Sequence, residues 1–502
     1  MSPGPISFPF FGCLASILYH FGWNIFSKST FEMFADFKKI WGSPISFKLG
    51  RIRAVLIDDM QMARKLMISE DWANRLDDNP MWYKQTFGGH NGLLISNGES
   101  WKEMRKFIHK NLTRHGFGRT RALEMIHEIE ILNFFDHLDK LRGKSEDKAI
   151  NMKGIFNISA FNILWRLVAG SRFSYNNEEF IKMMKLLDEF ARSIHPREMG
   201  FLVFPWLRHF PKLSAYQKFI DNHKQMQNFF LGIIEERRRA GDYKEKQETF
   251  IDVFLHEIDH HKNENMTPNY YTDEQFAMVL VDLFITGFVP TASCLEFLVM
   301  FMILHPEIQN KCHEEIDLVI GKSRFPSIND NENMPYTQAV CLEVLRHVTF
   351  IPMTTRAATK DTQIDDYFIP KGTIAALNIY GIHHDKNTWE NPSEFNPDRF
   401  LDADGKLCNQ DLILAFGTGK RICPAEVFAR VSTFTYFVYL MQKYSFECPP
   451  NCVPPDPIPS VGMGNYAKPY RCVVRDRQLV SSYTIANTNH KSSLDEDCGT
   501  LV

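Results

Sequence analysis

The sequence lacks the cysteine spacing of a disulfide framework or of a structural zinc site. Its 10 cysteines are scattered over 502 residues, and none of them forms a C-x-x-C pair. Structural zinc sites bring their ligands in such close pairs, and small disulfide-rich folds carry cysteine at high density. The pattern therefore argues against both classes and is typical of a chain that works in a reducing compartment.

The chain also lacks an excess of charge of either sign. It has 57 Lys and Arg residues against 60 Asp and Glu residues, which gives a net charge of −3. Proteins that bind nucleic acids carry a basic surplus, so no nucleic acid partner is expected. The 44% of hydrophobic residues indicate an ordered globular chain, and the 42 Phe suit either a large core or a cavity for an apolar ligand.

The N-terminus lacks the uninterrupted apolar run of a spanning helix. Such a helix needs roughly 20 consecutive apolar residues, and Pro3, Pro5, Pro9 and Gly12 interrupt this segment. The basic residues that open a signal peptide are missing as well. Residues 1–20 are therefore expected to form a stiff, proline-rich hinge without an anchor helix.

No repeat or internal linker divides the rest of the chain, which predicts one large domain over residues 21–477. Residues 478–502 are polar and have no hydrophobic period, so a disordered tail is expected there. Helical patterns predominate and strand-like runs are short, which predicts a mainly α fold with a small β portion. Helices are expected at 101–112, 120–141, 153–170, 177–193, 213–240, 248–261, 273–304, 306–320 and 335–347. Strands are expected near 46–57, 353–356, 362–368 and 373–379.

The longest expected helix covers residues 273–304. Thr272 and Gln275 form a capping-box signature at its start, and His305-Pro306 ends it. Its span of roughly 48 Å is apolar almost all round, which is typical of a helix that crosses a protein core or a membrane. Asp282 in its interior favours a core.

A second apolar stretch, Met199–Leu207, has two interpretations. It is either a buried connection with a short core helix or a contact with a membrane surface. The sequence alone does not separate the two.

The segment Phe416-Gly-Thr-Gly-Lys-Arg-Ile-Cys-Pro-Ala425 carries the strongest chemical signal. A thiolate that binds haem iron needs a loop whose backbone closes around the sulfur and donates hydrogen bonds to it. Gly417 and Gly419 permit such a backbone, and Arg421 offers a positive charge to a haem propionate. Considered alone, a cysteine in a glycine-rich loop is more often an inert buried thiol.

This segment resembles the signature F-x-x-G-x-R-x-C-x-G of the cytochrome P-450 superfamily. The matches are Phe416, Gly419, Arg421 and Cys423, with Ala425 at the position of the last glycine.

Two further segments resemble the superfamily in order and spacing. Glu343-Val-Leu-Arg346 resembles its E-x-x-R pair, whose side chains share one helix face. Phe395-Asn-Pro-Asp-Arg-Phe400 resembles its F-x-P-E-R-F segment. The resemblance implies that Arg399 completes an ion network with Glu343 and Arg346.

The resemblance also implies a set of haem contacts. Trp101 and Arg105 resemble the W-x-x-x-R pair that binds a propionate, and Arg356 matches another arginine that reaches a propionate. The expected architecture is a single-domain cytochrome P-450 fold that holds haem b. Cys423 is then the metal ligand, and Phe416 and Arg421 are further cofactor contacts.

The resemblance fails at the proton-relay motif of the long helix. The superfamily carries A/G-G-x-D/E-T there, and its acid and threonine pass protons to dioxygen. Gly287 matches the glycine, but Val289 and Pro290 replace the acid and the threonine and carry no side-chain proton. Three explanations are open. Thr291, or substrate hydroxyl and water, relays protons; the enzyme rearranges an oxygenated substrate such as a peroxide; or the haem turns over poorly.

The resemblance to microsomal animal members, with an arthropod character, implies the reaction and its partners. The expected reaction is monooxygenation of a lipophilic molecule (steroid, isoprenoid, fatty acid or xenobiotic) with electrons from an NADPH–cytochrome reductase. The expected location is the cytosolic face of the endoplasmic reticulum membrane, with a peripheral form open because no anchor is expected. Alternatives are a haem-binding relative with impaired oxygen activation and an isomerase or dehydratase acting on a peroxide. The substrate pocket is expected to include Phe284, Phe288, Ile351, Met353 and Val461.

Overall fold

The computed structural model describes residues 3–8, 12–21, 30–50, 52–76, 86–145, 147–193, 204–210 and 216–477. The helices are α1 Leu14–Phe21, α2 Thr30–Trp41, α3 Met60–Ile68, α5 Gly98–Arg114, α6 Arg121–Lys144, α7 Asn157–Ala169, α8 Glu178–Ser193, α10 Tyr216–Ala240, α11 Phe250–Asn263, α12 Asp273–Leu304, α13 Pro306–Val319, α14 Pro335–Val348, α15 Ile379–His383 and α16 Glu426–Lys443. The strands are β1 Ile45–Leu49, β2 Ile52–Ile57, β3 Ala149–Asn151, β4 Thr354–Ala357, β5 Thr362–Ile364, β6 Tyr367–Ile369, β7 Ile374–Leu377, β8 Tyr444–Glu447, β9 Ser460–Val461, β10 Asn465–Tyr466 and β11 Arg471–Asp476. The fold is mainly α with small sheets, as predicted.

Helix α12 has the bounds that the sequence predicted. The side chain of Thr272 accepts the backbone N–H of Gln275 at 3.1 Å and caps the start, and His305 follows the last residue. The helix remains continuous through Pro290.

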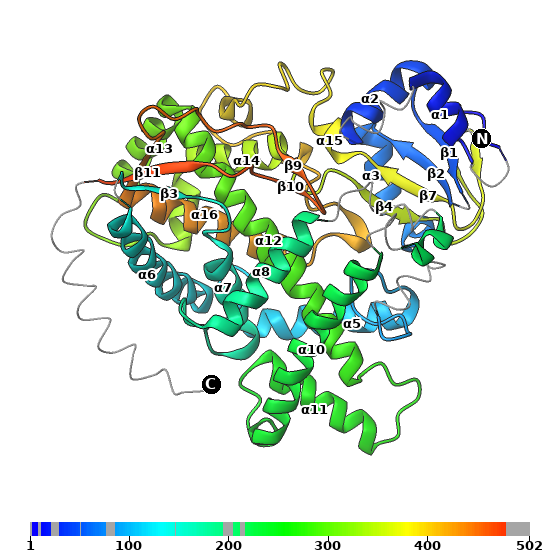
Figure 1. Cartoon of the computed structure of the whole chain (residues 1–502), viewed down its shortest axis with the longest axis horizontal. Coiled ribbons are helices and arrows are strands. Elements are labelled where there is room, and N and C mark those ends of the chain that lie inside the picture. Colours follow the sequence, from blue (N-terminus) through cyan, green and yellow to red (C-terminus); the bar gives the residue numbers. More distant parts are fainter. Residues whose placement is uncertain are drawn as a thin grey trace.

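Helix α12 forms the centre of the fold. It runs through the middle of the molecule, with α7, α10 and α16 packed along it (Figure 1). In the described part of the chain it is the one helix long and apolar enough to span a membrane, but its most apolar stretch is 83% buried inside the fold. The prediction of a core helix is therefore the one that the structure supports.

The largest sheet lies beside the N-terminal helices (Figure 1). Its strand order is β1-β2-β7-β4, with β2 and β7 parallel and the other neighbours antiparallel. The predicted strand at 46–57 is a hairpin that turns at Gly50, where φ is +54°. The predicted strand at 362–368 is likewise the hairpin β5–β6, which turns at Asp365.

The N-terminal prediction needs one correction. The segment that was expected to be an irregular hinge contains helix α1, which begins at Leu14, beyond the last of the interrupting Pro and Gly residues. Cys13, next to this helix, donates its backbone N–H to the carbonyl of Lys48 on β1 at 2.6 Å. The predicted tail at 478–502 lies outside the described residues, as does most of the apolar stretch at 199–207.

Candidate functional site

Cys423 lies at the end of a tight loop before α16. Its backbone N–H donates to the carbonyl of Phe416 at 2.9 Å, which closes the loop. Gly417 and Gly419 have φ of +70° and +72°, a left-handed region that favours glycine. A Cβ atom at Gly419 would collide with the backbone carbonyl of Met67, so this residue also permits the close approach of α3.

The thiol of Cys423 has competing influences on its ionisation. Burial raises its pKa above the ordinary value, and the backbone N–H of Ala425 and the charge of Arg105 act in the opposite direction. The guanidinium of Arg105 donates to the carbonyl of Ile422 at 2.6 Å, directly before the cysteine. A metal ion that bound this sulfur would add the decisive stabilisation of the thiolate.

Four arginines converge beside this loop, and three of them were predicted from the sequence. Burial, together with repulsion from Arg75, Arg356 and Arg105, lowers the pKa of Arg421 to about 8. Burial and two of the same neighbours lower the pKa of Arg356 to about 9. Arg421 also lies over the ring of Trp101, at 3.7 Å from its centre.

The arginine cluster fits an anionic cofactor. Within the described part of the chain no carboxylate pairs with any of the four guanidiniums, and the buried Nε atoms of Arg75 and Arg356 have no hydrogen-bond partner there. Like charges remain together in a buried site only when a counter-charge compensates them. The two propionates of a haem would supply it, and Cys423 would supply the axial ligand of the iron.

One face of α12 is open along an otherwise buried helix. Between Gln275 and Ile303 every residue is buried except Asp282, Thr286, Gly287 and Pro290. Positions 282, 286 and 290 are four residues apart, so they stack on one side of the helix. We call these three residues the α12 stripe.

The α12 stripe is attached to the arginine cluster through one loop. The carboxylate of Asp282 accepts the backbone N–H groups of Leu93 and Leu94 at 2.7 and 2.8 Å. Two residues further on, the carbonyl of Ser96 accepts Arg421 at 2.8 Å. The loop at 92–97 therefore joins the open face of α12 to the arginine cluster.

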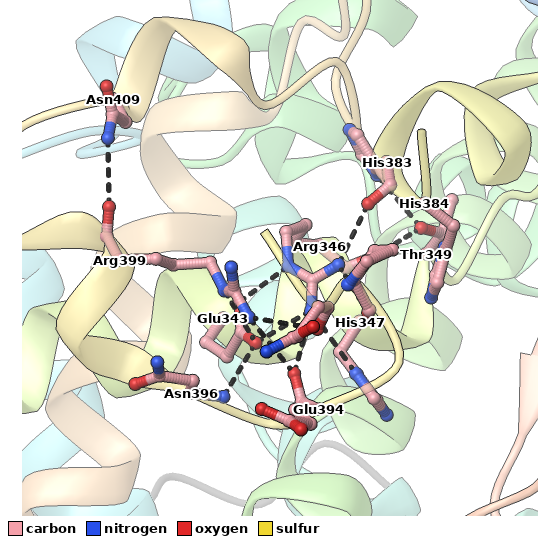
Figure 2. A network of polar contacts seen from close by, with 12 residues as sticks. Glu343, Arg346, His347, Thr349, His383, His384, Glu394, Asn396, Arg399 and Asn409 are labelled. Carbon is pink, nitrogen blue, oxygen red and sulfur yellow. Dashed lines mark hydrogen bonds and ion pairs between the residues drawn. The ribbon is translucent and has the colours of Figure 1, made fainter. Parts of the chain in front are cut away.

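The E-x-x-R motif forms a buried ion network (Figure 2). Glu343 and Arg346 are fully buried and share two contacts of 2.7 Å, Nε–Oε2 and Nη2–Oε1. Arg399, from the 3-10 helix Pro397–Phe400, reaches Glu343 at 3.2 Å. Nη1 of Arg346 donates to the carbonyls of His383 and Pro392 at 2.8 and 2.9 Å, and Nη2 also donates to the carbonyl of Glu394 at 3.2 Å. The network fixes the segments that precede the Cys423 loop.

The comparisons with known proteins agree with this geometry. The family model for cytochrome P-450 matches residues 2–474. This chain belongs to the cytochrome P-450 family. It is 34% identical to cytochrome P-450 2J2 of Homo sapiens over 89% of this chain and 86% of that protein. It is 31% identical to cytochrome P-450 2U1 of Bos taurus over 86% of this chain and 79% of that protein. It is 29% identical to the farnesoate epoxidase of Bombyx mori over 96% of this chain and 94% of that protein.

Membership of the cytochrome P-450 family settles the class of chemistry. The chain is a haem-dependent monooxygenase, an oxidoreductase of the haem-thiolate type. Its relatives are animal microsomal proteins, including insect ones, as the sequence indicated. The likeness to microsomal relatives implies a redox partner, lipophilic substrates and an association with the endoplasmic reticulum.

In this cytochrome P-450 the two predicted catalytic residues, Gly287 and Thr291, make packing and backbone contacts within the fold. A Cβ atom at Gly287 would lie 2.7 Å from Leu164 on α7, so the glycine permits close packing of α7 and α12. Thr291 is 7% exposed, and its hydroxyl donates to the carbonyl of Gly287 at 3.1 Å. Thr291 therefore lies off the α12 stripe.

The predicted pocket residues fall into two groups. Phe284 and Phe288 are buried against Phe161 of α7, with ring centres 4.4 and 5.5 Å from it. They are two residues from Thr286 on either side, and two residues turn a helix by about 200°, so they face away from the stripe. The structure thus places both in the core between α12 and α7, off the α12 stripe.

The other pocket candidates lie in loops that contact each other. Ile351 and Met353 are partly exposed on the segment between α14 and β4, and Val461 is partly exposed on β9. The amide of Asn465 donates to the carbonyls of Val348 and Thr349 at 2.8 and 3.1 Å, which holds the β9–β10 hairpin against that segment. These residues keep their place as pocket candidates.

The sequence analysis did not identify Arg75 or Thr286 as residues of the site. It also did not predict that Asp282 holds the loop at 92–97. Arg75 stands in no motif. The pairing of Asn74 with Ala357, and the bond of the Arg75 guanidinium to the carbonyl of Thr355, bring it beside Arg356. The α12 stripe could have been found from the sequence, because the polar residues Asp282 and Thr286 stand four positions apart in an otherwise apolar helix.

Proposed function

We propose that this cytochrome P-450 inserts one atom of dioxygen into a lipophilic small molecule, with Cys423 as the axial ligand of haem b. The observation that carries the proposal is the convergence, beside the closed Cys423 loop, of four guanidiniums that no carboxylate neutralises within the described residues. The bound haem supplies the activation of oxygen. The residues of the chain hold the cofactor, orient the substrate and move protons.

The roles of the haem contacts follow from their donors. Arg421, Arg356 and Arg105 present N–H groups to the propionates, and Trp101 fixes Arg421 by stacking. Phe416 accepts the N–H of Cys423 and so keeps the sulfur in place. The ion network of Glu343, Arg346 and Arg399 has a structural role.

The substrate belongs to the steroids, isoprenoids, fatty acids or lipophilic xenobiotics. The name of the Bombyx mori relative supports the isoprenoid class, since it identifies that protein as a farnesoate epoxidase. Partly exposed apolar side chains at Ile351, Met353 and Val461 support a substrate pocket with an apolar lining.

The electron donor is an NADPH–cytochrome reductase that docks on a basic face. Lys106 and Lys110 are exposed on α5, the helix that also carries Trp101 and Arg105. Electrostatic steering by such a face raises the association rate with an acidic flavoprotein. Lys102 and Lys420 are paired with Glu99 and Glu70 and contribute less.

The protein works at the cytosolic face of the endoplasmic reticulum membrane. Trp206 and Phe210, which belong to or follow the 3-10 helix Pro205–His209, expose 54% and 50% of their surface. Large exposed aromatic side chains next to Arg208 fit the interface of a lipid bilayer, and this supports a membrane contact for the segment around 199–207.

A carbon monoxide difference spectrum tests the proposal. The protein is expressed with haem, reduced by NADPH with a microsomal reductase, and exposed to carbon monoxide. We expect the strongly red-shifted Soret band of a thiolate ligand, and Cys423→Ser is expected to lose it. A band that appears only with dithionite would contradict the electron donor, and no such band under either condition would contradict the thiolate assignment.

A second candidate function rests on Val289 and Pro290, which leave the usual proton relay without its side chains. It is a haem-binding protein with impaired oxygen activation, or an isomerase or dehydratase of peroxides. NADPH-dependent oxygen uptake separates the candidates. A monooxygenase consumes oxygen faster with its substrate, and the alternatives do not.

A further inference from the structure

Thr286 is the exposed hydroxyl of the α12 stripe. All other residues of α12 that lie within one turn of it, except Asp282, Gly287 and Pro290, are buried. Its hydroxyl donates to the backbone carbonyl of Asp282 at 2.6 Å. The oxygen keeps lone pairs that accept a hydrogen bond from water or from a substrate hydroxyl.

Pro290 changes the hydrogen bonding of the same residue. In an α-helix the N–H of position 290 donates to the carbonyl of position 286, and proline has no N–H. The carbonyl of Thr286 therefore lacks its helix partner although the helix continues. Thr286 thus offers two polar groups at one place, a hydroxyl and a backbone carbonyl. Such a pair can bind one water molecule with two hydrogen bonds.

The neighbouring side chains do not offer an equivalent group. Phe288 and Val289 are buried and apolar. The hydroxyl of Thr291 bonds the carbonyl four residues back, as that of Thr286 does, but Thr291 is buried and lies off the stripe. Asp282 is on the stripe, but its carboxylate is committed to Leu93 and Leu94.

We infer that Thr286, with the carbonyl that Pro290 leaves without its helix partner, holds a water molecule and relays protons to dioxygen. This inference rests on the proposed function. The superfamily carries its threonine at the position of Pro290. The hydroxyl of Thr286 stands one helical turn before that position, on the same face of the helix.

The proton balance of this relay is simple. One oxygenation consumes one O2, two electrons from the reductase and two protons, and it gives the oxygenated product and one water. The hydroxyl of Thr286, which donates to the carbonyl of Asp282 in this structure, would turn from it to give its proton to the oxygen molecule under reduction and would regain one from its bound water. That water is reprotonated from solvent, so Thr286 is unchanged after each turnover.

Thr286→Val tests the relay, because valine has the shape of threonine and no hydroxyl. Thr291→Val is the matched control, five residues along the helix and off the stripe, and Thr286→Ser keeps the hydroxyl. The first readout is the C–O stretching frequency of carbon monoxide on the reduced haem, which reports hydrogen-bond donors beside the ligand. The second is the solvent deuterium isotope effect on the decay of the oxygen-bound reduced enzyme.

We expect Thr286→Val to shift the C–O frequency and to lose the isotope effect. Thr291→Val and Thr286→Ser are expected to keep both at the wild-type values. The inference is overturned if Thr286→Val matches the wild type, or if Thr291→Val alone changes the two readouts. The red-shifted carbon monoxide band of the wild-type protein is recorded first, so a failure of the thiolate assignment is distinguished from a failure of the relay.

Discussion

The imidazole of His383 accepts the backbone N–H of Leu414 at 2.9 Å through Nε2, two residues before Phe416. Its Nδ1 lies 2.8 Å from the hydroxyl of Thr349, which itself donates to the carbonyl of Arg346. Nε2 must be unprotonated to accept, so Nδ1 carries the proton and donates to Thr349. Burial lowers the pKa of His383 to about 3, which keeps the ring neutral. His383 thus connects the ion network of Figure 2 to the Cys423 loop.

Replacement of His383 by leucine is expected to destabilise the protein. Leu414 and Thr349 would lose their partner in a buried region, and an unsatisfied buried group costs about 1–3 kcal/mol. Chemical denaturation followed by circular dichroism measures the loss. His109→Leu, at an exposed position of α5, is the control and is expected to change little. Equal stability of the His383→Leu variant and the wild type would contradict the connecting role.

The sequence predicted the elements whose signals are local. The bounds of α12 were predicted because the cap at Thr272 and the stop at His305-Pro306 lie next to the helix. The hairpins at Gly50 and Asp365 were predicted as single strands, because a positive φ at one residue leaves little trace in a hydrophobic pattern.

Contacts between distant segments could not be predicted in the same way. His383 and Leu414 are 31 residues apart and stand in no motif. Phe284 was assigned to the pocket through the resemblance to the cytochrome P-450 superfamily. The face of the helix on which it lies depends on the packing of α7.

Arg421→Gln is expected to weaken haem binding. The variant loses a charged donor, and hydrogen bonds to charged groups are worth about 1.5–3 kcal/mol, which corresponds to roughly a 10- to 100-fold weaker affinity. Transfer of haem to an excess of apomyoglobin measures the retention of the cofactor. Arg239→Gln, on the exposed end of α10, is the matched control. Faster haem loss in the control variant, or none in Arg421→Gln, would contradict the propionate assignment.

Glu296→Gln is expected to change the pH dependence of stability. Burial raises the pKa of Glu296 to about 7 and outweighs the attraction of Arg192, whose Nη2 atom lies 3.3 Å from the carboxylate. A raised pKa means that the folded state holds its proton while the unfolded chain has lost it. The contribution of Glu296 to stability therefore falls as the pH rises from about 4.5 to 7 and is constant above that range.

Thermal denaturation at pH 5, 6, 7 and 8 measures this effect. The midpoint of the wild-type protein should fall relative to that of Glu296→Gln between pH 5 and pH 7, and the difference should be level at pH 8. Glu235→Gln, at an exposed position of α10, should follow the wild type throughout. A difference that does not vary with pH would show that Glu296 ionises normally.

The relay at Thr286 also predicts a rescue. The usual acid and threonine, introduced as Val289→Glu with Pro290→Thr, should restore the solvent isotope effect in a chain that carries Thr286→Val. The reason is that the threonine returns a hydroxyl to the same face of α12, one turn further on. The measurement is the decay of the oxygen-bound reduced enzyme in H2O and in D2O. A triple variant that behaves like Thr286→Val alone would contradict the idea of a displaced hydroxyl.

The four arginines beside the Cys423 loop have a consequence for the life of the protein in the cell. Their mutual repulsion opposes folding, and a dianionic cofactor that binds among them removes the penalty, so cofactor binding adds directly to the free energy of folding. Haem binding and degradation therefore compete for each newly made chain. The amount of this protein in a tissue should follow the local haem supply as well as the transcription of its gene.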